Sequence, residues 1–539
     1  LGRHRAIVAV TTVAVVVLAL GGVLAIRRIL DEERHADAER EIAIEQKGLA
    51  ERNAAAAGEL VHFMMFDLHT KLEHVGKLDL LDAVAHRSAT YYDERGDSDP
   101  VQLATARESI GTVLEAKGDL EGALAEYKKG QVAVAKQSDP KAQRMSARLL
   151  ARIGSVQATR RDVAAGLAST EAALKIVTSV PPSDPDVMRD EIFVRDKLLA
   201  IYDIERKVDQ SIAMARAIGG LWERLAKSDH ASVQLAVEAR ERMASRLAEG
   251  KDGTGAIAEF RADLAVADAE LAKQPSSAVW IELVRALHAD LGRQLAAAND
   301  QAGALGEFRT ELSLAEKRLA LDPTSAVSQE AVAHAHEHLG RALLRKKPRD
   351  RKDLADAVLE ARASLALRTD LVTKDPTNAA AKRALAVTHH NLGEALDAAN
   401  DVRGAQAEYR AALAIRQAIF ALDATNVQAR EEVVRSHVAL AKSYGAKDNP
   451  RAIAELRAAI AILQEDSTAH PAAPTIAWNL ALEESDLAEA LVRGRDRAGA
   501  KTQLAAAIAT ADRMAALADA WPEWKPLGLK LRAKLAALH

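Results

Sequence analysis

Histidines are the residues of this chain whose spacing could do chemistry. Four of them stand four residues before a repeated glycine or alanine position: His288, His336, His389 and His437. Because imidazole binds metal ions and titrates near neutral pH, such a column could form a metal ladder or a pH sensor. However, helices of adjacent units pack about 8–10 Å apart, too far for two imidazoles to share a zinc ion with bonds near 2.1 Å. We therefore interpret the column as packing between helices.

A second histidine pair, His334 and His338, lies one helical turn apart and could chelate a metal ion. The sequence places no cysteine or third histidine to complete such a site, and His336 points elsewhere on the helix. We therefore expect no metal site at this pair.

Catalytic motifs are absent from the sequence. There is no GxxxxGK phosphate loop, no His-Arg-Asp or Asp-Phe-Gly kinase motif, and no HExxH metalloprotease motif. The nearest approach is His86-Arg87-Ser88, which lies in a helical segment. We predict that these residues hold no active site and no cofactor.

The composition favours closely packed helices. Hydrophobic residues make up 49% of the 539 residues, yet aromatic residues make up only 3%, so burial depends on alanine, leucine, valine and isoleucine. The net charge of -4, from 73 basic and 77 acidic residues, offers no basic field for nucleic acid. We expect an all-α protein that does not bind DNA or RNA.

The elements that position these residues follow an internal repeat, which is typical of a solenoid. Its units begin at Gly111, Gly154, Leu199, Ala244, Gly292, Gly340, Gly393, Ala441 and Ala488. These starts span 377 residues in eight intervals, a mean near 47. Sixteen residues after four of the starts stands an aromatic residue: Tyr127, Phe260, Phe308 and Tyr409. Twelve residues after the same four starts stands an alanine: Ala123, Ala256, Ala304 and Ala405.

This pattern resembles the tetratricopeptide repeat, in which a Leu-Gly pair, an alanine, an aromatic residue and a proline stand at fixed offsets. Leu291-Gly292, Ala304 and Phe308 match the first three offsets, but Pro323 comes about seven residues later than in the 34-residue form. Seven residues are close to two helical turns, so we expect each helix to be two turns longer. The resemblance implies a right-handed superhelical solenoid of antiparallel helix pairs, with about nine repeats.

Within each unit we expect the turn glycine, such as Gly303, to end the first helix and the aromatic residue to fill the gap to the neighbouring unit. The interval between Gly340 and Gly393 is longer because the turn at residues 346–350 carries five extra residues.

The resemblance also implies a concave face that is lined by first helices near the Leu-Gly pair. The matching candidates are Arg293, Glu337, Arg341, His390, Glu394 and Asp397. Their mixed charge suits a polar peptide or an extended segment of a protein partner. A merely solvated helix face is the alternative.

An apolar stretch near the amino terminus predicts a transmembrane helix. From Ala6 to Ile26 the chain has 21 residues without a charge, flanked by arginines, and these would span roughly 30 Å. A cleaved signal peptide is the alternative. We expect a single-pass protein of the bacterial inner membrane, with an extracytoplasmic repeat region slightly favoured.

A second resemblance concerns the segment after this stretch. Phe63-Met64-Met65-Phe66-Asp67-Leu68 and Leu78-Asp79-Leu80-Leu81-Asp82 look like the segment that follows a transmembrane helix in large bacterial signalling proteins. There it joins a serine/threonine protein kinase or a STAND-type NTPase to a repeat tail. The resemblance implies a non-catalytic scaffold or sensor module, or the carboxy-terminal part of an enzyme whose catalytic domain lies upstream of Leu1. A structural envelope-assembly protein is a third possibility.

These inferences divide the chain into five parts. We expect a membrane helix with basic flanks at 1–28, a juxtamembrane helix at 29–58, a helical hairpin or cap at 59–96, repeats at 97–515 and a capping helix at 516–539. The expected partners are a protein or peptide in the concave groove and the membrane, and the chain could also associate with itself.

Overall fold

The computed structural model describes residues 22, 40, 45–48, 99–181, 184–229, 231–422, 426–517 and 521–538. The predicted membrane helix at residues 6–26, the juxtamembrane helix and the hairpin at 59–96 fall almost wholly outside these residues. In the part that is described, none of the helices has the length and apolar character that crossing a bilayer requires.

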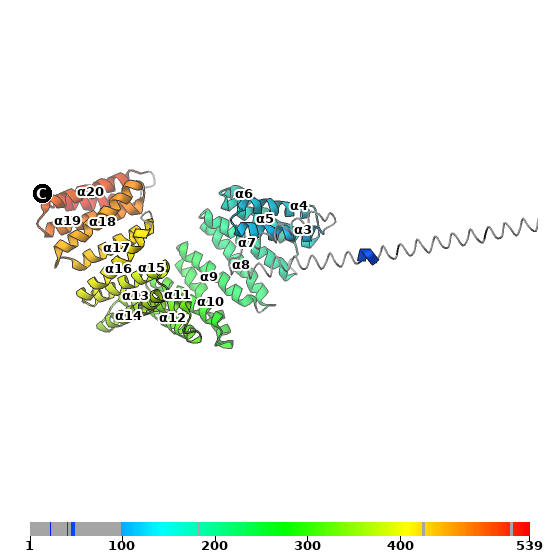
Figure 1. Cartoon of the computed structure of the whole chain (residues 1–539), viewed down its shortest axis with the longest axis horizontal. Coiled ribbons are helices and arrows are strands. Elements are labelled where there is room, and N and C mark those ends of the chain that lie inside the picture. Colours follow the sequence, from blue (N-terminus) through cyan, green and yellow to red (C-terminus); the bar gives the residue numbers. More distant parts are fainter. Residues whose placement is uncertain are drawn as a thin grey trace, which may run out of the picture. The chain divides into compact units, whose positions relative to one another are not determined.

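The described residues form helices and connecting turns, without a strand (Figure 1). The chain divides into two compact units, Leu1–Leu221 and Trp222–His539, and the boundary falls within α8. The helices before α8 are α3 (Pro100–Ala116), α4 (Leu120–Val134), α5 (Pro140–Thr159), α6 (Val163–Ser179) and α7 (Pro185–Ile204), and α8 itself spans Val208–Ala226. The all-α prediction is therefore confirmed for the described part of the chain.

The second unit continues the same alternation of helices. Its first half holds α9 (Ser232–Glu249), α10 (Gly253–Lys273), α11 (Ala278–Ala297), α12 (Gln301–Leu321), α13 (Ala326–Arg345), α14 (Arg351–Lys374) and α15 (Ala379–Ala398). Its second half holds α16 (Val402–Leu422), α17 (Val427–Tyr444), α18 (Asn449–Ala469), α19 (Pro474–Arg493), α20 (Arg497–Ala515) and α21 (Trp524–Ala536).

Each repeat start predicted from the sequence lies in the first helix of one pair, from Gly111 in α3 to Ala488 in α19. From α9 to α21, consecutive helices pack against each other, for example α11 with α12 and α13 with α14. The prediction of five extra residues in the turn at 346–350 was only partly right. That turn has five residues where the turn between α11 and α12 has three, and the rest of the extra length lies in α14, which has 24 residues where α12 has 21.

The turn inside a hairpin is built by an aspartate that caps the second helix. Asp300 accepts a hydrogen bond from the backbone nitrogen of Gly303 at 2.9 Å, and Asp401 does the same for Gly404 at 3.0 Å. Such caps satisfy a backbone donor that the first helical turn leaves without a partner. The residue before the cap, such as Asn299 with φ 65°, takes the left-handed conformation.

This geometry corrects the role expected for the turn glycine. Gly303 does not end the first helix, because α11 already ends at Ala297 and Gly303 lies in the first turn of α12. A Cβ atom at Gly303 would lie 2.5 Å from the Asp300 carboxylate. Glycine is therefore present because the capping side chain needs the space.

The repeated glycine and the aromatic residue meet inside one hairpin. A Cβ atom at Gly111 would lie 2.3 Å from the Tyr127 ring, and one at Gly292 would lie 2.6 Å from the Phe308 ring. The ring thus fills space against its own first helix, in addition to the gap expected toward the next unit. Phe308 also reaches that unit, where its centroid lies 5.3 Å from the centroid of His338.

The hairpin of α13 and α14 lacks this contact. At the aromatic position that faces Gly340 stands Ala361, and the nearest atom to a Cβ at Gly340 would be the Ala357 carbonyl oxygen at 3.4 Å. A void of about 10 Å³ remains there, bordered by α13, α14 and α15. The buried arginine Arg368 lies two turns further along α14, where it holds α13 and α15 together.

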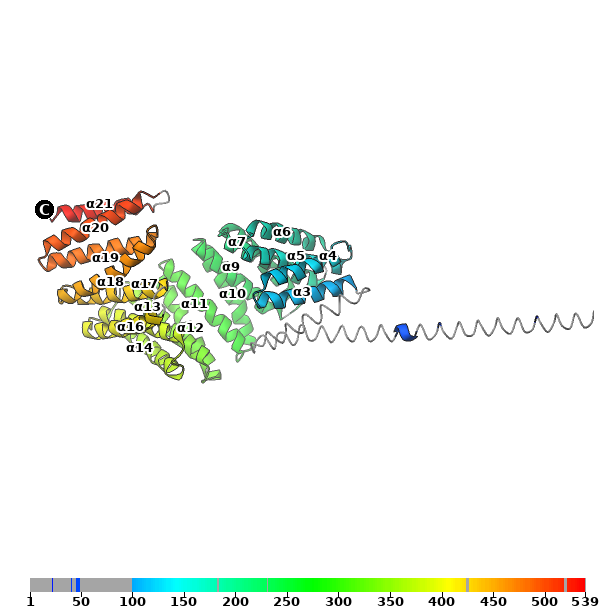
Figure 2. The ribbon, with the colours of Figure 1, turned by 45° about the horizontal axis from the view of Figure 1, so that its top comes forward.

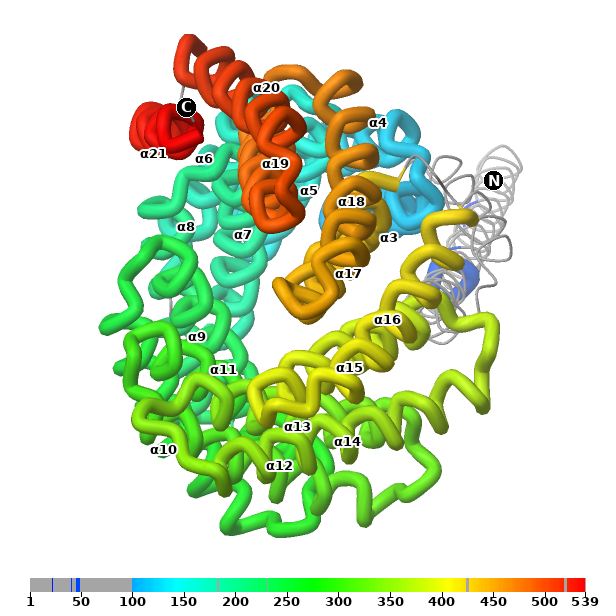
Figure 3. The backbone as a smooth tube through the Cα atoms, turned by 90° about the vertical axis from the view of Figure 1, so that its left-hand side faces the viewer, coloured from blue at the N-terminus to red at the C-terminus, as the bar shows by residue number. Residues whose placement is uncertain are grey.

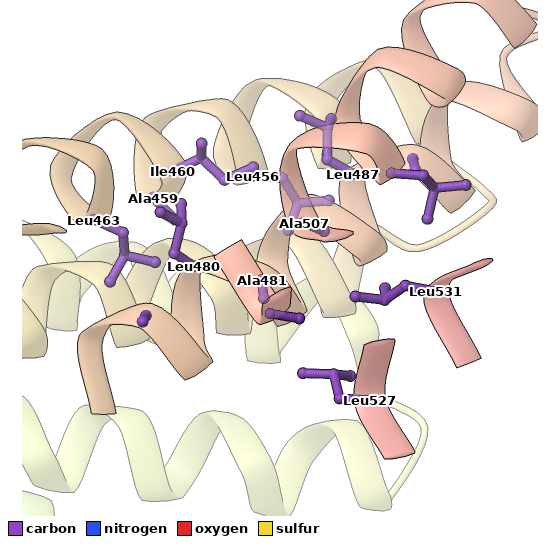
Figure 4. Close-up of a cluster of buried hydrophobic side chains, with 14 of the residues drawn as sticks. Leu456, Ala459, Ile460, Leu463, Leu480, Ala481, Leu487, Ala507, Leu527 and Leu531 are labelled. Atoms are coloured by element: carbon purple, nitrogen blue, oxygen red, sulfur yellow. The ribbon is translucent and has the colours of Figure 1, made fainter. Parts of the chain in front are cut away.

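The carboxy-terminal helices share one apolar cluster. Figure 2 shows α18, α19, α20 and α21 in successive layers, and Figure 4 shows the leucines and alanines between them. Trp524 of α21 is buried against this cluster with Leu527 and Leu531. Burying one such leucine contributes about 1.5–3 kcal/mol, so α21 covers an apolar face that would otherwise meet water.

The second unit has an inner face that is formed by its first helices. Successive first helices, such as α11, α13 and α15, contact one another, whereas successive second helices are not in comparable contact. In Figure 3, α12 and α14 accordingly lie outside α11, α13 and α15. The unit therefore curves toward its first helices, and we call their solvent-facing side the inner face.

Candidate functional site

The six residues that the sequence singled out all lie on the first helices α11, α13 and α15, and the structure divides them into two groups. Arg293, Arg341 and Glu394 are exposed to solvent. Glu337, His390 and Asp397 are used mainly in contacts between helices.

The exposed group occupies one position of the repeat. Arg293, Arg341 and Glu394 each follow the glycine position by one residue, and the same position holds Lys442 and Glu489 in the next two units. All five are exposed and stand at one repeated position of the first helices, and they carry both signs of charge. We call these five residues the charge stripe.

Glu337 joins three helices of the second unit. Its carboxylate accepts a hydrogen bond from Arg368 of α14 at 3.0 Å and another from Asn391 of α15 at 2.7 Å. Arg368 also donates to the Thr388 hydroxyl at 2.6 Å. A buried guanidinium is costly unless it is paired, and this network pairs it. Glu337 therefore stabilises the joint between units.

Asp397 and His390 both pack against Tyr409. The Asp397 carboxylate accepts a hydrogen bond from Ser443 of α17 at 3.1 Å. Burial raises the pKa of Asp397, and burial together with the negative charge of Asp397 raises the pKa of Tyr409. The His390 ring lies 5.4 Å from the Tyr409 ring, centroid to centroid. These side chains close the space between α15 and α17.

The corresponding space between α11 and α13 is open. A pocket of about 230 Å³ lies there, next to Arg293 and Arg341 of the charge stripe. Its lining residues are Arg293, Ala296, Ala297, Phe308, His338, Arg341, Ala342 and Arg345. We call it the arginine pocket, because three arginines and His338 border a recess whose other lining residues are apolar.

The pocket is open because two side chains differ from those that close the space between α15 and α17. Tyr409 is replaced by Phe308, which has no hydroxyl group, and Asp397 is replaced by Ala296. The hairpin of α3 and α4 also pairs a tyrosine with an acid, because the Tyr127 hydroxyl donates a hydrogen bond to Glu115 at 2.8 Å. At these two positions of the repeat, a tyrosine is thus paired with an acid and a phenylalanine with an alanine. The pairing of phenylalanine with alanine leaves the recess between α11 and α13.

The histidine column is part of the joint inside each hairpin. Nδ1 of each histidine lies 2.6 Å from a glutamate carboxylate on the second helix. The four pairs are His288 with Glu307, His336 with Glu360, His389 with Glu408, and His437 with Glu455. In α3 an arginine takes the same position, and Arg107 pairs with Glu126 at 2.6 Å. The interpretation as packing agrees with this geometry, although the polar partner was not foreseen.

The pair His334 and His338 is also engaged with other helices. The Arg368 guanidinium donates to Nδ1 of His334 at 3.0 Å, and His338 lies 2.9 Å from the buried Glu311 carboxylate. No group of three metal-ligating side chains occurs among the residues that the structure describes. The described geometry therefore gives no support to a metal role for this pair.

Comparisons with known proteins give similarity in structure alone. No family model matches the chain, and a search of curated proteins finds no match. The apo form of RapI is 10% identical with a TM-score of 0.46, over 81% of this chain and 99% of its own. A STAND protein with a tetratricopeptide repeat sensor from Pyrococcus horikoshii is 11% identical with a TM-score of 0.44, over 77% of this chain and 55% of its own.

A tetratricopeptide repeat protein from Parabacteroides merdae is 13% identical with a TM-score of 0.36, over 62% of this chain and 99% of its own. Tetratricopeptide repeat proteins are thus among the structures that the chain is similar to. The repeat predicted from the glycine and aromatic spacing is confirmed by the hairpin geometry itself, in which Gly111, Gly292 and Gly393 contact the predicted rings.

Sequence reasoning missed Arg345 and the glutamate partners of the histidines. A signal for the glutamates was present, because each stands directly before the aromatic position of its unit. Arg345 follows Arg341 by four residues, which places both side chains on one helix face. The charge stripe was recognised only in part, since Lys442 and Glu489 belong to it.

Proposed function

We propose that this chain is a non-catalytic scaffold that binds a protein partner on the inner face of its second unit. The observation that carries the proposal is the charge stripe beside the arginine pocket. Exposed charges of both signs stand at one repeated position, so an extended polypeptide laid along the first helices would meet them in succession.

The alternative of a merely solvated face explains the charges but not the recess between them. A solvated face needs no apolar recess. At the equivalent place between α15 and α17 the space is filled by Tyr409, Asp397 and Ser443. The pocket is also smaller than the roughly 300–1,000 Å³ of sites that hold drug-sized ligands. A side chain of a bound polypeptide suits it better than a cofactor does.

Membrane tethering and a role in a signalling protein are further parts of the proposal that depend on sequence alone. The apolar stretch from Ala6 to Ile26 would anchor the scaffold, and binding would act on a linked effector by bringing chains together. Reporter fusions at the carboxy terminus would test the anchor, because they reveal on which side of a membrane the repeats lie. The rival, an enzyme with a catalytic domain upstream of Leu1, is tested by the reading frame there.

Site-specific photocrosslinking tests the scaffold function. A photoreactive amino acid at Lys442, on the inner face and away from the pocket, is expected to capture a discrete protein in cells. The matched control replaces Arg309, an exposed residue of the second helix α12. Equal capture at both positions, or no protein adduct at Lys442, would contradict the proposal.

A further inference from the structure

The arginine pocket has a distinct chemistry within the inner face. Its floor is the Phe308 ring, which is 4% exposed, and its walls include Ala296, Ala297 and Ala342. Around this apolar recess stand three arginines from two helices. The recess favours an apolar group, and its rim favours anions.

The rim arginines are available to a ligand to different degrees. Arg293 contacts Asp290 of its own helix, and Arg341 lies 3.9 Å from Glu337, whose carboxylate is already shared by Arg368 and Asn391. Arg345 is exposed and forms no ion pair with any of the described residues. Arg341 and Arg345 follow one another by a single helical turn, so both can reach one ligand segment.

The charges on the inner side of the pocket support an anionic ligand. Glu394 of α15 is an exposed carboxylate that faces these arginines, and its pKa is lowered by a hydrogen bond from His390 and by the charges of Arg341 and Arg345. The buried Glu311 is engaged by Arg285 and His338, and its charge also acts on Arg293. The guanidinium pair therefore already stabilises a carboxylate beside the pocket.

We infer that the arginine pocket binds an acidic peptide segment by inserting one apolar side chain over Phe308 while flanking carboxylates pair with Arg341 and Arg345. Arginine suits this task because its planar guanidinium binds a carboxylate with two parallel hydrogen bonds. Arg293 on the facing helix gives a third contact on the opposite rim. The inference rests on the proposed function, since it states which kind of segment of the protein partner binds in the pocket.

The test measures binding of three labelled peptides to the full chain, purified in detergent. The first carries one leucine among aspartates and glutamates, the second replaces the acids with asparagine and glutamine, and the third replaces the leucine with glycine. We expect the first peptide to bind at least tenfold more tightly than either control, and to weaken as salt concentration rises.

Two variants separate the two halves of the pocket. Arg341→Glu with Arg345→Glu should weaken binding of the acidic peptide at least tenfold, and Arg341→Glu alone should also weaken it. Arg309→Glu, a single charge reversal on α12 that matches Arg341→Glu, should leave binding unchanged. Ala296→Leu should also weaken binding, because it fills the recess with the side chain that Leu344 provides at the equivalent position of the next unit. Circular dichroism checks that each variant remains helical.

The inference is overturned if the acidic and neutral peptides bind equally, or if Ala296→Leu leaves the affinity of the leucine peptide unchanged. Such a failure is distinct from failure of the scaffold function. If Lys442 captures a protein partner while the acidic peptide does not bind, only the pocket assignment is wrong. If neither occurs, both proposals are wrong.

Discussion

A Cβ atom placed on Gly393 would lie 2.5 Å from Cε1 of Tyr409, which comes sixteen residues later on the facing helix. No real Cβ atom tolerates such a distance, so glycine at this position is required by the ring. The contrast with Gly340, which faces Ala361, makes this requirement testable within one chain.

Gly393→Ala should destabilise its hairpin by about 1–3 kcal/mol, because the Tyr409 ring must move out of a well-packed site. Gly340→Ala should be neutral or stabilising by up to about 1 kcal/mol, since alanine favours a helix and the added methyl group meets nothing closer than 3.4 Å. Hydrogen exchange of the peptides from α15 and α13 measures both changes. Equal effects of the two substitutions would refute the explanation.

Asp300→Ala should destabilise the start of α12 by roughly 0.5–2 kcal/mol, because the backbone nitrogen of Gly303 loses its acceptor. Asp300→Asn keeps an oxygen in the same place and serves as the control. Faster hydrogen exchange is expected in the first turn of α12 for the alanine variant. The cap has no such role if both variants exchange at the same rate.

The stability of the carboxy-terminal end should depend on pH through Glu484. Burial raises the pKa of this glutamate from 4.5 to about 7. Because the folded state favours the protonated form, the stabilisation is complete below pH 4.5 and is lost as the pH rises through 7. Glu484→Gln should therefore stabilise the protein at pH 8, by up to about 3 kcal/mol, and change little at pH 4.5.

Urea unfolding followed by tryptophan fluorescence measures this effect, since Trp478 and Trp524 lie in contact near the same helix. The unsubstituted protein, measured at the same two pH values, is the control. A gain for Glu484→Gln that is equal at both pH values would show that titration is not its cause.

His389 and Glu408 should be energetically coupled by about 0.5–1.5 kcal/mol, since their side chains lie 2.6 Å apart and are largely shielded from solvent. A double-mutant cycle with His389→Asn and Glu408→Gln, read by hydrogen exchange in α15 and α16, measures the coupling. Strictly additive effects would mean that the two groups are neighbours without a stabilising contact.

The sequence spacing predicted the hairpins well because the contact that builds them joins two residues at a constant separation. Gly292 and Phe308 carry this signal directly. The turn glycine was misjudged because glycine commonly follows the end of a helix, whereas here Asn299 takes the left-handed conformation. An aspartate three residues before a glycine was the overlooked sign of a cap.

The arginine pocket could not be predicted from spacing, since it depends on volume that is missing between two helices. Phe308 and Ala296 are each ordinary residues in their own helix. The recess arises only because the fold brings these two residues together between α11 and α13. Glu337 was predicted to be a binding residue because the sequence does not reveal that Arg368 of α14 forms a hydrogen bond with it.

The matched contacts within each hairpin bear on how such an array can grow. The glycine and its ring, the histidine and its glutamate, and the tyrosine and its acid all lie in the same pair of helices. A gene duplication that copies one whole pair therefore transmits both partners of each of these three contacts at once. A duplication whose ends fall between the two helices separates the partners, so recombination in the turns after the second helices is the route that preserves the fold.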